Sequence, residues 1–137
     1  MRRVVLDANV LVSYFIDRNP AQGDAEDELL RKAEAGDIVA IVPQFVVFEV
    51  SYVLQSLYGI TGEPLGAVIH DIVNFPGVKI VDECPWNRVL KMWPNPLRSL
   101  ADAAIVALVT TNGYDAVATF DQNLGKRLKE LGAATYW

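Results

Sequence analysis

The stretch RVVLDANV, residues Arg3 to Val10, decides the fold of this chain. The apolar run Val4–Leu6 is typical of a strand that is buried on both faces, and a helix is expected from Ala8 to about Asp17. Asp7 therefore lies where a strand ends and a helix begins. Open parallel sheets bind ligands in the crevice outside the carboxyl ends of their strands, so this carboxylate is placed where chemistry is expected.

Apolar runs separated by turn residues continue this alternation along the chain. Further strands are expected at residues 38–42, 78–81, 115–119 and 134–137, and further helices at residues 24–35, 43–58, 63–75, 86–93, 100–111 and 122–131. Strands that alternate with helices form parallel sheets covered on both faces. We therefore expect a three-layer α/β/α sandwich with a central, mainly parallel sheet of four to five strands. No repeat or linker interrupts residues 1–137, which are expected to form a single domain.

Composition is that of a compact domain. Of the 137 residues, 52% are hydrophobic and 21% are charged, and a chain of this length buries roughly two-thirds of its unfolded surface. The longest apolar run, Phe45–Phe48, is too short to span a membrane, and Asp7 interrupts the only stretch that resembles a signal peptide. The one cysteine, Cys84, cannot form an internal disulfide, so we expect a cytoplasmic protein.

The charge pattern allows two interpretations. A net charge of −5 disfavours nucleic-acid binding through bulk charge, but six of the 17 acids lie between Asp24 and Asp37. No acid occurs between Pro85 and Ala101. Basic residues recur there and near the end of the chain: Arg88, Lys91, Arg98, Lys126, Arg127 and Lys129. These are either solvated helix faces or the lining of a groove that follows a phosphate backbone.

Three aspartates have a structural explanation when each is taken alone. Asp7 and Asp121 both follow a predicted strand and open a helix, so either carboxylate can accept the free N–H groups of an N-terminus. Ser99-Leu100-Ala101-Asp102 matches a capping box, in which Asp102 would reach back to Ser99. On this basis a capping role for each aspartate is at least as good as a catalytic one.

Glu49 is harder to explain as a structural residue. Its neighbours on one helix face, three and four positions away, are all apolar: Phe45, Val46, Tyr52 and Val53. Glutamate is rarely buried without a partner, and residues 33–78 contain no lysine or arginine. Glu49 therefore needs a partner from elsewhere in the fold, and a metal ion is a good candidate.

Convergence of these acids would create a metal site. Two carboxylates about 4 Å apart repel by roughly 4 kcal/mol at an effective dielectric near 20, so a cluster either takes up protons or binds cations. Oxygen-only ligands favour Mg²⁺ or Mn²⁺ over zinc. The only histidine, His70, lies in a different predicted helix and is interpreted as a surface or structural residue, and Cys84 has no companion ligand.

Four segments resemble PIN-domain ribonucleases in order and spacing over essentially the whole chain. They are DANVL at residues 7–11, Glu49 within its apolar helix, DAAIVA at residues 102–107 and TFD at residues 119–121. The compact size looks most like VapC-type toxins of toxin–antitoxin pairs. By this resemblance Asp7, Glu49, Asp102 and Asp121 are the catalytic acids that hold divalent metal, and Asn9 and Thr119 support them.

Two positions depart from the family pattern. Ala8 stands where Ser or Thr is common, and Asn123 stands where some relatives carry a further acid, which puts a second metal ion in doubt. The resemblance implies an Mg²⁺- or Mn²⁺-dependent endoribonuclease, the toxin of a type II pair, with a cognate antitoxin, a homodimer and no membrane. Arg98, Lys126 and Arg127 are candidate contacts to the RNA backbone.

Other functions stay open at this point. A Mg²⁺-dependent phosphatase or a receiver-like domain also places aspartates at strand ends, but Asn9 replaces the second acid of aspartyl phosphatases, and Asp7 lacks the paired acid of receivers. An RNA-processing PIN nuclease outside toxin–antitoxin systems and a non-catalytic binding module are further alternatives. The helix at residues 43–58 is apolar on nearly every face, so it is either central to the core or part of an interface.

Overall fold

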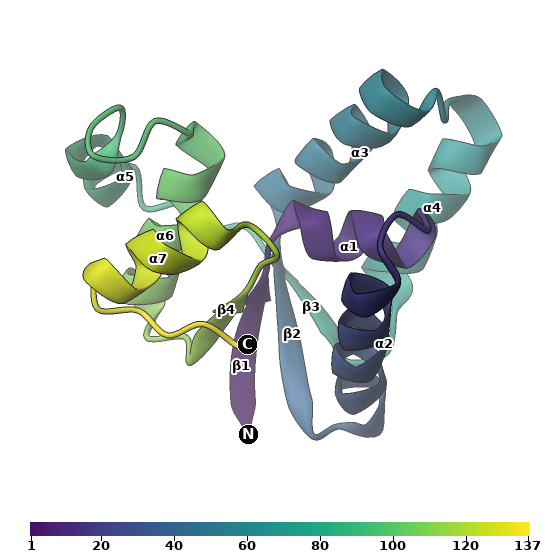
Figure 1. Ribbon diagram of the computed structural model, residues 1–137, viewed down its shortest axis with the longest axis horizontal. Helices are drawn as coiled ribbons and strands as arrows, with labels where there is room; N and C mark the ends of the chain where they lie inside the picture. The colour runs from purple at the N-terminus through teal and green to yellow at the C-terminus, as the bar shows by residue number, and fades with distance from the viewer.

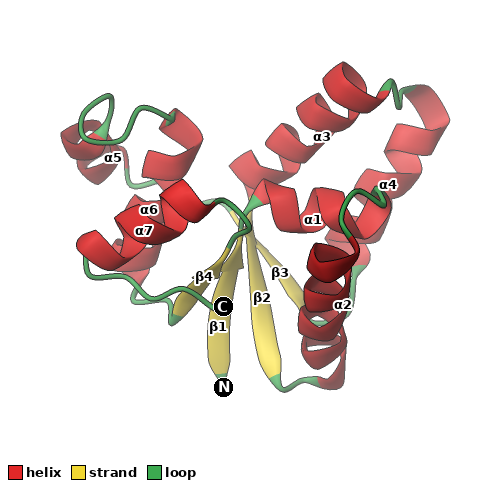
Figure 2. Ribbon diagram, in the orientation of Figure 1, coloured by secondary structure: helices red, strands yellow, loops and turns green.

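The computed structural model describes residues 1–137 as a four-stranded parallel sheet flanked by seven helices (Figure 1; Figure 2). The strands are β1 (Arg2–Leu6), β2 (Ile38–Pro43), β3 (Val78–Val81) and β4 (Ala116–Ala118). The helices are α1 (Ala8–Phe15), α2 (Pro20–Ala35), α3 (Gln44–Tyr58), α4 (Gly62–Asn74), α5 (Trp86–Met92), α6 (Leu100–Asn112) and α7 (Gln122–Glu130). The expected α/β/α architecture is confirmed.

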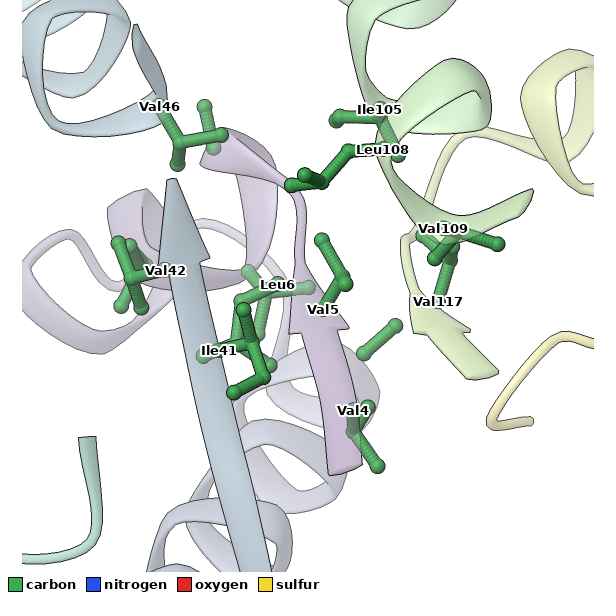
Figure 3. Close-up of a cluster of buried hydrophobic side chains, with 14 of the residues drawn as sticks. Val4, Val5, Leu6, Ile41, Val42, Val46, Ile105, Leu108, Val109 and Val117 are labelled. Carbon is green, nitrogen blue, oxygen red and sulfur yellow. The ribbon is translucent and has the colours of Figure 1, made fainter. Parts of the chain in front are cut away.

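The two central strands are apolar because both of their faces are covered. Val4, Val5 and Leu6 of β1 are fully buried, and β2 is buried along most of its length. Figure 3 shows side chains of β1, β2 and β4 gathered with Ile105 and Leu108 of α6 in one core. Both faces of the central strands are therefore packed against other parts of the core.

The order of the strands creates a crevice next to Asp7. The sheet has the order β3-β2-β1-β4, and every pairing is parallel. The chain thus leaves β1 towards β2 and later returns to the other side of β1 as β4. In Figure 1, α1 to α4 lie towards the β2 and β3 side of the sheet, whereas α5 to α7 lie towards the β4 side. Ligands bind where the direction of strand order reverses, which is here the carboxyl end of β1 and β4.

Helix α2 begins earlier than residue 24, where the sequence analysis placed it. The Asn19 side chain accepts a hydrogen bond from the backbone N–H of Gln22 (3.2 Å), and Pro20 occupies the first helical position. The helix ends as expected at Gly36, whose φ of 83° is a left-handed conformation that suits glycine. The cap at Asn19 accounts for the difference.

The predicted fifth strand at residues 134–137 is wrong. Thr135 forms only an isolated bridge with Val117, supported by two backbone hydrogen bonds: Val117 N–H to the Ala134 oxygen (2.9 Å) and Tyr136 N–H to the Val117 oxygen (2.8 Å). Its partner β4 has only three residues, which leaves too short a ladder for a strand. Trp137 then stacks on the ring of Phe120.

Helix α3 has a buried face, as the core interpretation predicts, and an exposed apolar face, for which the interface interpretation stays a prediction. Val46, Val50 and Leu54 are fully buried on one face, while Phe48 and Tyr52 are 71% and 70% exposed on another. Helices α3 and α4 pack against each other as a hairpin, as Figure 1 shows. His70 is exposed on α4, as expected. None of the seven helices has the length and hydrophobicity needed to cross a membrane.

Candidate active site

The four predicted acids come from four different elements. Asp7 follows β1 and caps α1, and Asp121 caps α7 shortly after β4. Asp102 lies in the first turn of α6, and Glu49 lies in the second turn of α3. We call Asp7, Glu49, Asp102 and Asp121 the acidic cluster. Since α1 and α3 both begin at the carboxyl edge of the sheet, the cluster is assembled at the topological switch (Figure 1).

Asp7 is 6% exposed and is held by three hydrogen bonds. Its Oδ1 accepts from the backbone N–H of Ala8 (2.8 Å), and its Oδ2 accepts from the Thr119 hydroxyl (2.7 Å) and from Asn9 Nδ2 (3.2 Å). The Asp7 backbone N–H also donates to the oxygen of Ala118 (3.0 Å), which continues the pairing of β1 with β4. The carboxylate therefore has a fixed position and orientation.

Thr119 connects Asp7 to Asp121. Its hydroxyl donates to Asp7 and accepts from Asn9 Nδ2 (3.3 Å) and from the backbone N–H of Asp121 (3.0 Å). One donor and two acceptor positions are the full capacity of a hydroxyl group, so Thr119 has no freedom to turn. Asn9 completes the connection by accepting from the Phe120 backbone N–H (3.1 Å). Asn9 and Thr119, predicted as supporting residues, lie where such support is needed.

The charges of the cluster interact. Burial raises the pKa of the Asp7 carboxyl, hydrogen bonds from Thr119 and Ala8 lower it, and the charge of Asp121 raises it. Burial also raises the pKa of Asp102 to about 6, with contributions from the charges of Asp7 and Asp121 against a hydrogen bond with Ser99. The pKa of Glu49 rises to about 7 through burial and the charges of Asp7 and Asp102. Asp7 interacts with each of the other three acids.

The Glu49 carboxyl has a free oxygen. Its Oε1 is buried and has no hydrogen-bond partner, which is uncommon for a buried polar atom and requires an explanation. No three side chains of the cluster converge closely enough in the structure to form a complete set of metal ligands. The donor set nevertheless fits a hard divalent cation, because all donors are carboxylate oxygens, and the charges of Asp7 and Asp102 raise the pKa of Glu49.

The capping roles and the cluster positions are compatible. Asp7 caps α1 through Ala8 N–H, and Asp121 Oδ1 caps α7 by accepting from the N–H groups of Asn123 (2.9 Å) and Leu124 (3.2 Å). The capping box at α6 is only half formed. Ser99 Oγ accepts from the Asp102 N–H (3.2 Å), but the return bond from the Asp102 carboxylate to the Ser99 N–H is not formed. Asp102 is thus not used as a cap.

The three basic residues that the sequence analysis singled out lie next to the cluster. Arg98, Lys126 and Arg127 line a pocket of about 500 Å³ together with Asp102 and Asp121. Arg127 also pairs with Glu130 on the same helix (3.1 Å), so part of its charge is compensated. The remaining positive charge faces a pocket with an acidic wall.

Sequence reasoning missed other residues around Asp121. Arg18 lines a second pocket of about 400 Å³ with Asn9 and Asp121, and its Nη2 donates to the Asn9 backbone oxygen (3.0 Å) and to Ser13 Oγ (2.9 Å). A third pocket of about 350 Å³ contains Lys129 and Trp137. Arg18 and Trp137 had no local signal, because both reach the site only through tertiary packing, whereas Lys129 was already among the basic residues of the sequence analysis.

An apolar groove of about 860 Å³ leads to Glu49 from the other side of the cluster. Phe48 and Tyr52 of α3 form one wall, and Trp86 and Leu100 form the other, with all four side chains exposed. This groove explains why the neighbours of Glu49 on the helix are apolar: some of them pack in the core, and others line the groove and face solvent. Exposed aromatic side chains at this density are typical of an interaction surface.

Comparison with known proteins places this arrangement in a family. A search of curated protein sequences finds no match. Among solved structures, the chain is similar to the Mycobacterium tuberculosis toxin VapC20, described as cleaving the sarcin–ricin loop, with a TM-score of 0.70 and 13% sequence identity over 90% of this chain and 94% of that one. At this identity the likeness establishes the fold. The PIN domain family model matches residues 4–130, almost the whole chain, and the protein therefore belongs to the PIN domain family.

Proposed function

We propose that this protein is a divalent-metal-dependent endoribonuclease that hydrolyses RNA phosphodiester bonds with the acidic cluster. The observation that carries the proposal is the free, buried Oε1 of Glu49, a carboxyl whose pKa is raised by burial and by the charges of Asp7 and Asp102. Such a group of carboxylates is stabilised by a cation. Membership of the PIN domain family supports the same conclusion.

Each acid has a distinct part in this mechanism. Asp7 and Asp102 would be the principal metal ligands, and Glu49 and Asp121 would complete the set. Thr119 and Asn9 hold Asp7 in the orientation that a ligand needs. When bound, Mg²⁺ or Mn²⁺ supplies Lewis acidity, which polarises the scissile phosphate and lowers the pKa of the attacking water.

Protons move when the cation binds. At neutral pH the Glu49 carboxyl, with a pKa of about 7, holds a proton in a substantial fraction of molecules. A ligand must be deprotonated, so this proton leaves when the cation binds. The net charge of −5 is then no obstacle to RNA, because cations offset the carboxylates at the point where phosphate approaches. Arg98, Lys126 and Arg127 contact the RNA backbone beside the cluster.

The experiment is cleavage of a structured RNA with Mg²⁺ or Mn²⁺ by the wild type and by Asp7→Asn and Asp102→Asn. Both variants are expected to lose at least about 100-fold in rate, which is a large share of the effect of a metal ion on hydrolysis. Glu63→Gln is the matched control, since it removes one exposed carboxylate from the first turn of α4. Full activity of both aspartate variants with intact folds would refute the proposal.

The finer assignment is the toxin of a type II toxin–antitoxin pair that acts in the cytoplasm. Two observations support it: the fold similarity to VapC20, which is described as an RNA-cleaving toxin, and the apolar groove beside Glu49, which suits a protein partner. An antitoxin would cover this groove, and the exposed Leu57 and Tyr58 at the end of α3 offer surface for a homodimer.

Growth and mass measurements test the toxin assignment. Expression is expected to arrest growth, Asp7→Asn is expected to abolish the arrest, and light scattering after gel filtration is expected to give a dimer. Growth that continues at full expression of an RNA-cleaving protein would assign the chain to RNA processing instead. A monomer at all concentrations would remove the homodimer from the proposal.

A further inference from the structure

We propose that the pocket beside Asp121 is a base-binding subsite, in which Trp137 stacks on one nucleobase of single-stranded RNA next to the bond at the acidic cluster. The inference rests on the proposed function, because it places one nucleotide of the RNA relative to the acids. The subsite consists of Phe120 and Trp137 as the aromatic platform and Lys126 and Lys129 as the cations.

The aromatic platform is ordered but open. The rings of Phe120 and Trp137 stack with centroids 4.7 Å apart and an angle of 12° between planes, and the Tyr136 ring meets Trp137 edge-on at 5.4 Å. Trp137 is still 44% exposed. A large ring that is fixed by aromatic neighbours and open to solvent is the usual platform on which a base stacks.

The backbone that carries Trp137 is fixed in advance. Two hydrogen bonds hold residues 134–136 on β4, and the Thr135 hydroxyl donates to the backbone oxygen of Trp137 (2.8 Å). On the far side, the guanidinium of Arg2 lies 5.3 Å from the centre of the Tyr136 ring. A platform held in this way loses little conformational entropy when a ligand binds.

Two free cations lie on the same wall of the pocket. Lys126 and Lys129 are three residues apart on α7 and therefore project from one face of the helix. Neither forms an ion pair, whereas Arg127 between them pairs with Glu130. Unpaired lysines beside an aromatic stack match the two parts of a nucleotide, its phosphate and its base.

Position and size connect this pocket to the acidic cluster. Asp121 and Lys126 line both this pocket and the neighbouring one that contains Asp102 and Arg98, so the two pockets share a wall. The volume of about 350 Å³ lies within the ~300–1,000 Å³ typical of small-ligand sites. A strand of RNA with a phosphate at the cluster can thus place the adjoining base on Trp137.

The composition of the pocket favours a nucleotide over a protein segment. Only two of its nine lining residues are hydrophobic, namely Phe120 and Trp137. The apolar groove beside Glu49 has eight hydrophobic residues among eleven, which is the surface expected for a protein partner. The two surfaces share no lining residue and differ in chemistry.

Fluorescence of Trp137 tests the contact directly. The chain has three tryptophans, so Trp86→Phe with Trp93→Phe leaves Trp137 as the only one while the platform stays native. An RNA octamer is titrated at low ionic strength in EDTA, which prevents hydrolysis, and its effect is compared with that of an octamer of abasic ribose-phosphate units. Saturable quenching by the RNA octamer and none by the abasic one is expected.

Binding of a labelled octamer to single variants of the full chain gives the energetic contribution. Trp137→Leu is expected to weaken binding on the order of 10-fold, whereas Trp137→Phe, which keeps a stacking ring, stays within about threefold. Tyr14→Leu, which replaces an exposed aromatic residue of α1 that lines neither this pocket nor the apolar groove, is the matched control and should not change the affinity.

Two outcomes separate this inference from the proposed function. Metal-dependent cleavage without quenching of Trp137, and with unchanged binding by Trp137→Leu, would overturn the subsite and leave the ribonuclease standing. Quenching and weaker binding by Trp137→Leu, in a protein that cleaves no RNA, would support the subsite and refute the ribonuclease. If Trp137→Leu does not fold, the quenching experiment still decides, because it uses the native platform.

Discussion

Neutralising Glu49 is expected to stabilise the metal-free protein while it weakens metal binding. The pKa of Glu49 rises from 4.5 to about 7, so ionising it in the folded state costs up to about 3 kcal/mol above pH 7. Since the side chain is partly exposed, we expect Glu49→Gln to recover about 2 kcal/mol of unfolding free energy at pH 8.5. Removing this charge also favours ionisation of Asp7 and Asp102, whose carboxylates repel it.

The pH dependence gives the sign of this effect. The folded wild type holds a proton on Glu49 up to about pH 7, whereas the unfolded chain loses it near pH 4.5. Wild-type stability therefore falls as the pH rises from about 4.5 to about 7 and then levels off, and Glu49→Gln lacks this part of the slope. Its advantage over the wild type should disappear near pH 4.5.

Urea unfolding followed by tryptophan fluorescence, in EDTA at pH 4.5 and 8.5, measures the difference. Asp82→Asn is the control, because Asp82 is an exposed acid that lines the same apolar groove. Adding Mn²⁺ should stabilise the wild type and the control more than Glu49→Gln. A Glu49→Gln protein that is less stable than wild type at pH 8.5 in EDTA would refute the electrostatic reasoning.

Three further predictions concern a buried acid, a tight turn and the support of Asp7. Glu26 is 1% exposed, its Oε1 has no hydrogen-bond partner, and burial next to Asp27 raises its pKa to about 8. In urea titrations Glu26→Gln should therefore add about 3 kcal/mol to the unfolding free energy at pH 7 and nothing near pH 4.5. Gly77→Ala would place a Cβ against the Ala33 oxygen at a φ of 84° and should lower the unfolding free energy by more than about 3 kcal/mol. Gly36→Ala, with a φ of 83° and free space around the new Cβ, should lower it by about 1 kcal/mol, and thermal melts of both variants measure the difference. Thr119→Val removes the hydroxyl that binds Asp7 and should weaken Mn²⁺ binding by about 10- to 100-fold in calorimetry, while Thr119→Ser retains it.

The sequence predicts the sheet because burial on both faces leaves a simple pattern. Val4–Leu6 and residues 38–42 are continuous apolar runs, and both are central strands of the structure. The sequence does not show how many residues of a segment will pair. Residues 134–137 are apolar and aromatic like a strand, yet they form only an isolated bridge with the three-residue strand β4. The start of α2 was missed because its signal is the cap at Asn19 and not an apolar period.

The acids of the candidate site could also be predicted from the sequence, whereas Arg18 and Trp137, which line the pockets beside Asp121, could not. Asp7 and Asp121 lie at strand ends, and Glu49 lacks a local cation, so each carries a signal within a few residues. Arg18 and Trp137 carry none. Arg18 enters the site by bonding the backbone of α1, and Trp137 by stacking on Phe120. Both placements depend on tertiary packing, which local sequence patterns do not describe.

Capping and metal binding are complementary uses of the same carboxylates. Three helices, α1, α6 and α7, begin at the acidic cluster, and a helix N-terminus carries a partial positive charge that stabilises nearby carboxylates. Asp7, Asp102 and Asp121 each benefit from one of them. Glu49, in the second turn of α3 and without any hydrogen bond to Oε1, receives no such help, and burial with the charges of Asp7 and Asp102 raises its pKa from 4.5 to about 7. Helix N-termini thus stabilise the aspartate carboxylates, whereas only a bound cation would stabilise the carboxylate of Glu49.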